Sequence, residues 1–194
     1  MKNENCANPE NLFVALLHYP VLNKRGEIIS SALTNLDLHD IARTAKTYNV
    51  GCFYVVTPLS DQKALAEKII GHWTTGYGAT YNAARREAIE LIRIEETFEN
   101  VLAHIRRITG KTPKTVVTSA RTGNGRISYE RFRSLLQEGT PVVLVFGTAW
   151  GLAEDFMNTA DYLLAPIAGN GGYNHLSVRC ASAIILDRVL GKQC

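Results

Sequence analysis

The protein has 194 residues, 46% of them hydrophobic and 20% charged, which suits one soluble domain with a sizeable core. No apolar run approaches the roughly 20 residues that span a bilayer, and the polar residues 1–11 do not resemble a secretory signal. The four cysteines are scattered without metal-ligand or redox spacing, which predicts a reduced, cytoplasmic protein. We expect residues 1–11 to form a flexible tail and residues 12–194 to form a single domain.

Apolar runs rich in β-branched and aromatic residues predict five buried strands, at 12–17, 52–56, 115–118, 142–146 and 162–167. Helical patterns fall between and after them, at 38–48, 62–73, 82–92, 98–109, 129–138 and 176–190. Asp37, Asp61 and Ser128 stand where N-caps are expected. The strands do not alternate in polarity, which is typical of parallel strands covered on both sides. The chain therefore predicts an α/β fold, a mostly parallel sheet with helices on both faces.

The last predicted helix is apolar on most of its circumference. Its apolar residues are Val178, Ala181, Ala183, Ile184, Ile185, Leu186, Val189 and Leu190. A helix of this kind must be buried on most sides. We expect one side to meet the sheet and another to meet a second copy in a homodimer. The alternative is a helix wrapped entirely by its own chain.

Basic charge is concentrated in one stretch, although the formal net charge is only +3. Residues 106–133 hold eight Lys or Arg residues and one acid, so this stretch carries +7 and the rest of the chain −4. A concentrated basic segment favours a polyanionic partner, and this one is a candidate phosphate-contacting surface. The alternative is a solvated helix and loop face.

Glycine-bearing chain follows each of the three C-terminal strands, at 119–125, 147–151 and 168–173. Ligands of open α/β sheets bind outside the carboxyl ends of the strands, so these loops predict one pocket walled mostly by backbone. Neither a dinucleotide fingerprint nor a phosphate-binding loop is present. The predicted apolar walls are Phe146, Leu152, Ile167 and Leu176. A ligand without phosphates, such as an adenosine-type cofactor, fits these features.

Three blocks carry a family resemblance: 35–43 (NLDLHDIAR), 142–152 (VVLVFGTAWGL) and 166–184 (PIAGNGGYNHLSVRCASAI). They resemble motifs of the SPOUT class of S-adenosylmethionine-dependent RNA methyltransferases, and most closely its stand-alone domains classed as predicted RNA methyltransferases. The resemblance implies S-adenosylmethionine as cofactor, RNA (tRNA or rRNA) as substrate, a trefoil knot across about 115–190, and dimerisation through the final helix.

The resemblance also implies roles for individual residues. Arg43, Asn35 and Ser177 match positions that act on the target group. The implied cofactor contacts are Thr118, Ser119, Phe146, Gly147, Thr148, Gly151, Leu152, Ile167, Gly169, Gly172, Tyr173, Asn174, Leu176 and Ser177. The alternatives are an exposed helix arginine at 43 and helix caps at 35, 174 and 177. No metal is implied.

One departure from the family pattern leaves the target atom open. The ribose-methylating branch usually carries a Glu between the glycines of its second motif, where this chain has Thr148, Ala149 and Trp150. Methyl transfer to a ribose 2′-oxygen or to a base nitrogen therefore both stay possible. The departure also supports an alternative function, a non-catalytic RNA- or nucleotide-binding module that retains the cofactor pocket. A nucleotide-linked oxidoreductase is disfavoured by the absent dinucleotide fingerprint.

RNA contacts are predicted from arginines beside aromatic residues. The segment 72–86 mixes tryptophan and tyrosine with Arg85 and Arg86, a combination that suits single-stranded RNA. Arg121 and Arg126 are the corresponding candidates in the basic segment. A packed loop is the alternative for 72–86. His175 is a candidate general base, or else a hydrogen-bonded structural residue, and Trp150 is a candidate pocket wall or base-stacking side chain.

Overall fold

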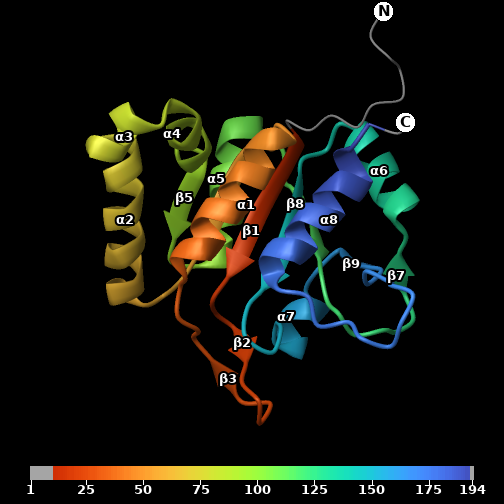
Figure 1. The fold of residues 1–194 in the computed structure, drawn as a ribbon. Helices are drawn as coiled ribbons and strands as arrows, with labels where there is room; N and C mark the ends of the chain where they lie inside the picture. Colours follow the sequence, from red (N-terminus) through yellow and green to blue (C-terminus); the bar gives the residue numbers. More distant parts are fainter. Residues whose placement is uncertain (1–10, 193–194) are drawn as a thin grey trace, which may run out of the picture.

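Seven parallel strands form the central sheet of the computed structural model, which describes residues 11–192 (Figure 1). Their order across the sheet is β5-β4-β1-β8-β6-β9-β7. The strands are β1 (Leu12–Leu17), β4 (Cys52–Val56), β5 (Ile92–Glu95), β6 (Lys114–Val117), β7 (Arg126–Ile127), β8 (Val142–Gly147) and β9 (Tyr162–Leu164). Two further strands, β2 (Val21–Leu22) and β3 (Ile28–Ile29), form a separate antiparallel pair. The predicted α/β fold is confirmed.

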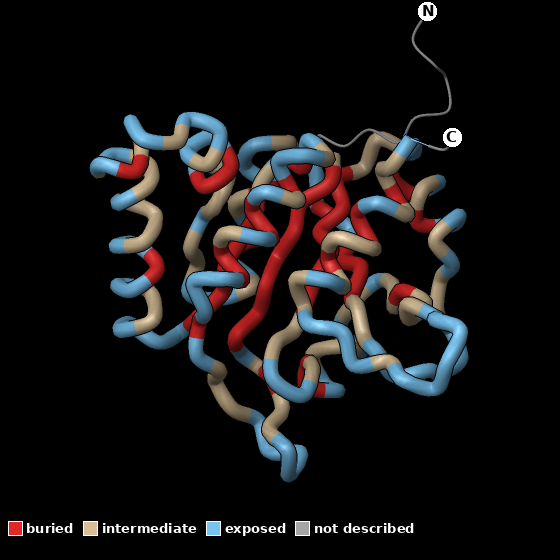
Figure 2. Tube along the Cα trace, viewed as in Figure 1, coloured by how far each residue is buried: buried red, intermediate tan, exposed pale blue. Residues whose placement is uncertain are grey.

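Helices cover both faces of this sheet (Figure 1). The helices are α1 (Asn35–Thr47), α2 (Ser60–Thr74), α3 (Tyr77–Tyr81), α4 (Ala83–Ile89), α5 (Phe98–Thr109), α6 (Tyr129–Gln137), α7 (Glu154–Asn158) and α8 (Val178–Leu190). Every residue of β1 is buried, and its side chains alternate between two apolar clusters. Val14 belongs to the cluster that includes α1, α6 and α8, while Phe13 belongs to the cluster that includes α5. Figure 2 shows this buried centre along the middle strands.

Two of the three predicted N-caps are wrong. Thr34 caps α1, because its hydroxyl accepts a hydrogen bond from the Asp37 N–H at 3.1 Å. The helix therefore begins before Asp37, whose carboxylate is held by other partners described below. Helix α2 begins after Leu59 without a side-chain cap, so Asp61 lies inside its first turn. Ser128 does cap α6, by accepting from the Arg131 N–H at 3.2 Å.

The predicted helix at 82–92 ends early and a strand follows it. Helix α4 stops at Ile89, and Ile92–Glu95 pairs with β4 as the edge strand β5. The alternation of Ile92 and Ile94 with charged residues is the period of a strand, and pairing with β4 outweighs continuation of the helix. The predicted strand at 162–167 also ends early, at Leu164, ahead of Pro166, which has no N–H for a sheet.

Helix α8 is packed mainly by its own chain. It lies against α1 and α6, and Ile185, Leu186 and Val189 are buried in the cluster on that face of the sheet. Ile184 differs, because it is half-buried and packs against neither apolar cluster. The all-round apolar pattern is thus largely explained within one chain, and the homodimer stays a prediction.

The knot across about 115–190 also stays a prediction. The segment that leads into α8 lies against the loop after β6, where the Asn174 amide donates to the Ala120 carbonyl at 3.0 Å. The expected flexible tail lies outside the described residues except for Asn11. Within residues 11–192, none of the helices has the length and apolar character needed to cross a membrane.

Candidate functional site

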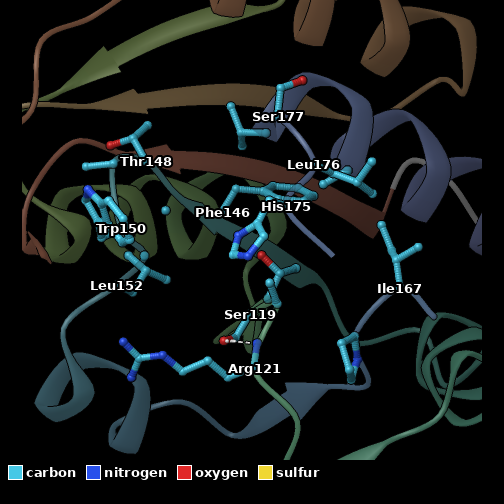
Figure 3. Close-up of a pocket in the computed structure, with 18 of the residues that line it drawn as sticks. Ser119, Arg121, Phe146, Thr148, Trp150, Leu152, Ile167, His175, Leu176 and Ser177 are labelled. Atoms are coloured by element: carbon cyan, nitrogen blue, oxygen red, sulfur yellow. Dashed lines mark hydrogen bonds between the residues drawn. The ribbon is translucent and has the colours of Figure 1, made fainter. Parts of the chain in front are cut away.

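A cavity of about 740 Å³ opens at the carboxyl edge of the sheet (Figure 3). Its walls come from four segments, at 118–121, 146–152, 165–167 and 174–178, with further residues from 31–37, α7 and α8. Three of these segments directly follow β6, β8 and β9. Because carboxyl ends of parallel strands meet at one edge, the loops converge there. The volume lies within the range of small-molecule sites.

Most of the predicted cofactor residues line this cavity. They are Thr118, Ser119, Phe146, Gly147, Thr148, Gly151, Leu152, Ile167, Asn174, Leu176 and Ser177. Gly169, Gly172 and Tyr173 do not line it. Their loop bulges into solvent, with Tyr173 77% exposed and open space around both glycines. These glycines therefore form an exposed turn beside the cavity rather than a wall.

The glycine loop after β8 is folded tightly against its neighbours. A Cβ atom on Gly147 would lie 2.7 Å from Leu152 Cγ, so this position has no room for a side chain. The Thr148 hydroxyl donates to the Leu17 carbonyl at 3.1 Å and lies 2.5 Å from the Ser31 hydroxyl. Ala149 has a φ of 50°, a left-handed conformation that is strained for a residue with a side chain. Such strain clusters at ligand-binding sites.

A charged cluster joins the first turns of α1 and α8 beside the cavity. The buried Asp37 carboxylate accepts from the Thr34 hydroxyl at 2.6 Å and from Arg179 Nη1 at 3.0 Å. Arg179 Nε also lies 3.3 Å from Asp40. Sequence reasoning missed this cluster. Thr34 and Asp37 have capping spacing, but nothing in the sequence indicates a partner 142 residues away.

The three predicted catalytic residues do not come together within one chain. Ser177 lines the cavity, and its hydroxyl caps α8 by accepting from the Cys180 N–H at 3.2 Å. Asn35 and Arg43 are exposed and do not line it. Helix α1 starts beside the cavity, but Arg43 lies six residues beyond Asp37, about 9 Å along the axis.

His175 is an imidazole side chain that lines the cavity. Figure 3 shows its ring between Phe146 and Ser119. The ring packs edge-on to Tyr173, with centroids 5.5 Å apart, and has no hydrogen bond to another described residue. The structural alternative for His175, a histidine held by hydrogen bonds, therefore has no support in residues 11–192.

The predicted RNA-contacting arginines lie in separate places. Arg121 lines the cavity, whereas Arg126 Nη1 donates to the Leu164 carbonyl at 3.3 Å. The guanidinium of Arg85 lies 4.5 Å from the Trp73 ring centroid, and Arg86 is paired with Glu90. Both sit on α4, at the opposite edge of the sheet from the cavity (Figure 1).

The basic segment 106–133 does not form one surface. It runs from α5 at the amino edge of the sheet, through the cavity loop, to α6. Several of its cations already have partners in the chain: Lys111, Lys114, Arg126, Arg131 and Arg133. The positive charge that is concentrated in this stretch of sequence is therefore spread over separate parts of the structure.

A buried histidine at the end of β1 was not singled out from the sequence. His18 is fully buried, and among the described residues neither ring nitrogen has a hydrogen-bond partner. Burial lowers its pKa, and the nearby Asp37 charge only partly opposes this shift. His18 is therefore neutral at physiological pH. Within the described residues, no group of three or more His, Cys, Asp or Glu side chains is placed to hold a metal.

Comparison with known proteins identifies the family. A model of a family described as SAM-dependent RNA methyltransferases matches residues 11–191. The chain belongs to this family. The match spans the whole sheet and all the loops of the cavity, and it confirms the resemblance drawn from the three sequence blocks.

Two relatives of this methyltransferase family differ in length. A protein of Oleidesulfovibrio alaskensis named tRNA (guanine-N(1)-)-methyltransferase is 47% identical over 181 residues, which are 93% of this chain but 42% of that protein. This chain thus spans about two-fifths of that relative. An uncharacterised protein of Aquifex aeolicus is 42% identical over 94% of this chain and 90% of its own length.

A solved structure shows the same fold. The SpoU methyltransferase AviRb of Streptomyces viridochromogenes, crystallised with the cofactor AdoMet, superposes with a TM-score of 0.59 at 15% identity. The match covers 98% of this chain and 60% of that protein. This likeness shows the fold alone, and that fold agrees with the α/β architecture predicted from the sequence.

Proposed function

We propose that the protein transfers a methyl group from S-adenosylmethionine to an RNA, at a ribose 2′-oxygen or a base nitrogen. The observation that carries the proposal is the cavity in which the loops of two family-like motifs, 146–152 and 166–178, meet beside the first motif's helix. The tRNA activity named for the Oleidesulfovibrio relative makes tRNA the first RNA to test. That name covers a protein more than twice as long as the matched part, so guanine N1 is one candidate position among several.

The residues of the cavity suit this cofactor. Phe146, Leu152 and Ile167 offer apolar cover for an adenine ring, and hydroxyls at Thr118 and Ser119 offer polar contacts for its edge or its ribose. The cofactor supplies a methyl group on a positively charged sulfur, which is already activated for transfer. The protein then has to orient the RNA nucleophile and accept its proton.

His175 and Arg121 are the residues of the chain that serve these two tasks in the proposal. The His175 imidazole, exposed to the cavity, accepts the proton of the attacking group. Arg121, on the opposite loop, holds a phosphate of the RNA. Asn35 and Arg43 lie outside the cavity of their own chain, so they act only if a second copy in a homodimer presents them to it.

Calorimetry and methyl transfer test the proposal. We expect purified protein to bind S-adenosylmethionine but not NAD, and to transfer labelled methyl from that cofactor to bulk tRNA. His175→Gln should lower the rate at least tenfold while leaving cofactor affinity unchanged. Arg43→Ala should lower the rate if the dimer is correct, whereas Lys46→Ala, one turn along the same helix, should not. Absence of cofactor binding would overturn the proposal.

A non-catalytic binding module is the second candidate. Among the described residues that line the cavity, Asp37 is the one carboxylate, and it is already occupied by Arg179. This observation, together with Thr148–Trp150 in place of an acid, favours a cavity that binds without reacting. Cofactor binding with no label on any RNA pool would support this second function.

A further inference from the structure

A short β-hairpin projects beyond the carboxyl edge of the sheet, next to the cavity (Figure 1). Strands β2 and β3 form it, with Val21 opposite Ile29 and Leu22 opposite Ile28. Neither the sequence motifs nor the proposed chemistry assigns it a role. In Figure 1 it extends below the end of β1 and beside α7, at the same carboxyl edge of the sheet as the cavity.

Backbone hydrogen bonds fasten this hairpin to the glycine loop that walls the cavity. The Leu22 N–H donates to the Gly151 carbonyl at 2.8 Å, and the Trp150 N–H donates to the Leu22 carbonyl at 3.0 Å. Val21 is also bridged to Leu152. A ligand that docks on the hairpin is therefore held in a fixed position relative to the cavity.

The turn of the hairpin is ordered before any ligand binds. The Asn23 side-chain oxygen accepts from the Arg25 N–H at 2.8 Å and from the Glu27 N–H at 3.0 Å. Gly26 has a φ of 80°, which the tight turn requires and which glycine adopts without strain. A preformed loop loses little conformational entropy on binding.

The tip of the hairpin is basic and free to bind an anion. Lys24 and Arg25 are exposed, and within residues 11–192 neither side chain has an ion pair or hydrogen bond. The nearest acid in the turn, Glu27, accepts from the Asn23 amide at 2.6 Å. At the base of the hairpin, Trp150 is 59% exposed at the cavity rim. Cations at the tip of the hairpin and an exposed aromatic ring at its base offer the groups that bind phosphates and bases of single-stranded RNA.

We propose that the β2–β3 hairpin is the RNA-docking element of the cavity. Lys24 and Arg25 bind the phosphates that flank the target nucleotide, and Trp150 stacks on a neighbouring base. The inference rests on the proposed function only in its choice of RNA as ligand. It replaces Arg85 and Arg86 as the contacts next to the target, because those residues lie at the opposite edge of the sheet.

RNA binding by a charge-matched pair of variants tests this inference. Lys24→Ala/Arg25→Ala removes the tip cations, and Lys46→Ala/Lys68→Ala removes two exposed cations on α1 and α2. Binding of fluorophore-labelled bulk tRNA is followed by anisotropy at several salt concentrations. We expect the hairpin variant to bind about tenfold more weakly, with the slope of log K against log salt reduced by about 2. The control variant should change neither quantity beyond the effect of net charge.

The outcomes separate this inference from the proposed function. Equal loss of tRNA affinity in both variants, or no loss in either, overturns the docking role of the hairpin even if the protein methylates RNA. Hairpin-dependent tRNA binding with no methyl transfer by the unaltered protein supports the docking role and overturns the proposed reaction. Calorimetry with S-adenosylmethionine checks both variants, because unchanged cofactor affinity shows that the cavity is intact.

Discussion

Asp37 is the side chain that ties two helices together at the rim of the cavity. It is buried, and it accepts from both Thr34 and Arg179. We expect Asp37→Ala to lower the free energy of unfolding by about 1–3 kcal/mol, because a half-buried guanidinium loses its main partner and α1 loses part of its cap. Asp40→Ala removes the more exposed arm of the same cluster and should cost less than about 1 kcal/mol. Urea denaturation measures both, and equal losses would contradict the assigned roles.

His18 makes the stability of the protein depend on pH. Its pKa is lower in the folded protein than the ordinary value of 6.5, so the unfolded chain binds the proton more readily. Stability is therefore fully present above about pH 6.5 and is lost as the pH falls below it. One proton gives at most about 1.4 kcal/mol per pH unit.

His18→Phe should flatten this dependence. His39 and His104 also have lowered pKa values and remain in the variant, so the difference between the two proteins isolates His18. Thermal melts at pH 5 and pH 8 measure it. An unchanged difference between the two melting temperatures would show that His18 is not the acid-sensitive group.

Residues that belong to a local pattern were predictable, and residues with distant partners were not. Phe146 and Gly147 follow a strand and carry the glycine signature, so the sequence places them at the cavity. Arg179 binds Asp37 across the fold, which no local pattern indicates. Nothing in the sequence singles out Lys24 and Arg25, because two adjacent cations close to Glu27 do not form a conspicuous basic run. Their importance comes from where the hairpin projects, and the sequence does not specify that.

At the scale of elements, long apolar runs were predicted well and short strands were not. Strand β1 agrees with its predicted run because each of its residues is buried. Strands β2, β3 and β7 have two residues each, too few for any periodicity to be detected. Two of these short strands form the hairpin beside the cavity. The least predictable elements are thus the ones that border the site.

The glycine loop after β8 gives an element-scale prediction. A Cβ on Gly147 would meet Leu152 at 2.7 Å and its backbone N at 3.0 Å, so Gly147→Ala has to displace the 148–152 wall. We expect S-adenosylmethionine affinity to fall at least tenfold, about 1.4 kcal/mol. Gly171→Ala, with no atom within 4 Å of the added Cβ, should bind normally. Calorimetry that finds the two variants equal would place the cofactor elsewhere.

At the scale of the whole molecule, the charge and burial of a single chain do not explain how the predicted RNA-contacting and catalytic residues would act together. The basic segment is divided between both edges of the sheet, and Arg43 stands away from the cavity of its own chain. Helix α1 packs beside α8 in the same chain, so we expect a dimer formed through α8 to place Arg43 near the interface. We expect sedimentation to give twice the 21.4 kDa of one chain.

Ile184→Glu tests whether α8 forms that interface. Ile184 is half-buried outside both apolar clusters, so a charge there should disrupt the dimer and leave the fold intact by circular dichroism. A native protein that sediments as a monomer at every concentration would contradict the homodimer. Dissociation of the variant, with loss of methyl transfer, would support a site shared between two copies.

The central claim is that this cavity delivers a methyl group to RNA. The most direct measurement incubates the protein with S-adenosylmethionine carrying a deuterated methyl group and total RNA from cells that lack the protein, followed by mass spectrometry of the nucleosides. The account predicts that one nucleoside, methylated on its ribose or on a base nitrogen, gains the heavy methyl. Tight cofactor binding in the same preparation, with no nucleoside gaining that mass, would contradict it.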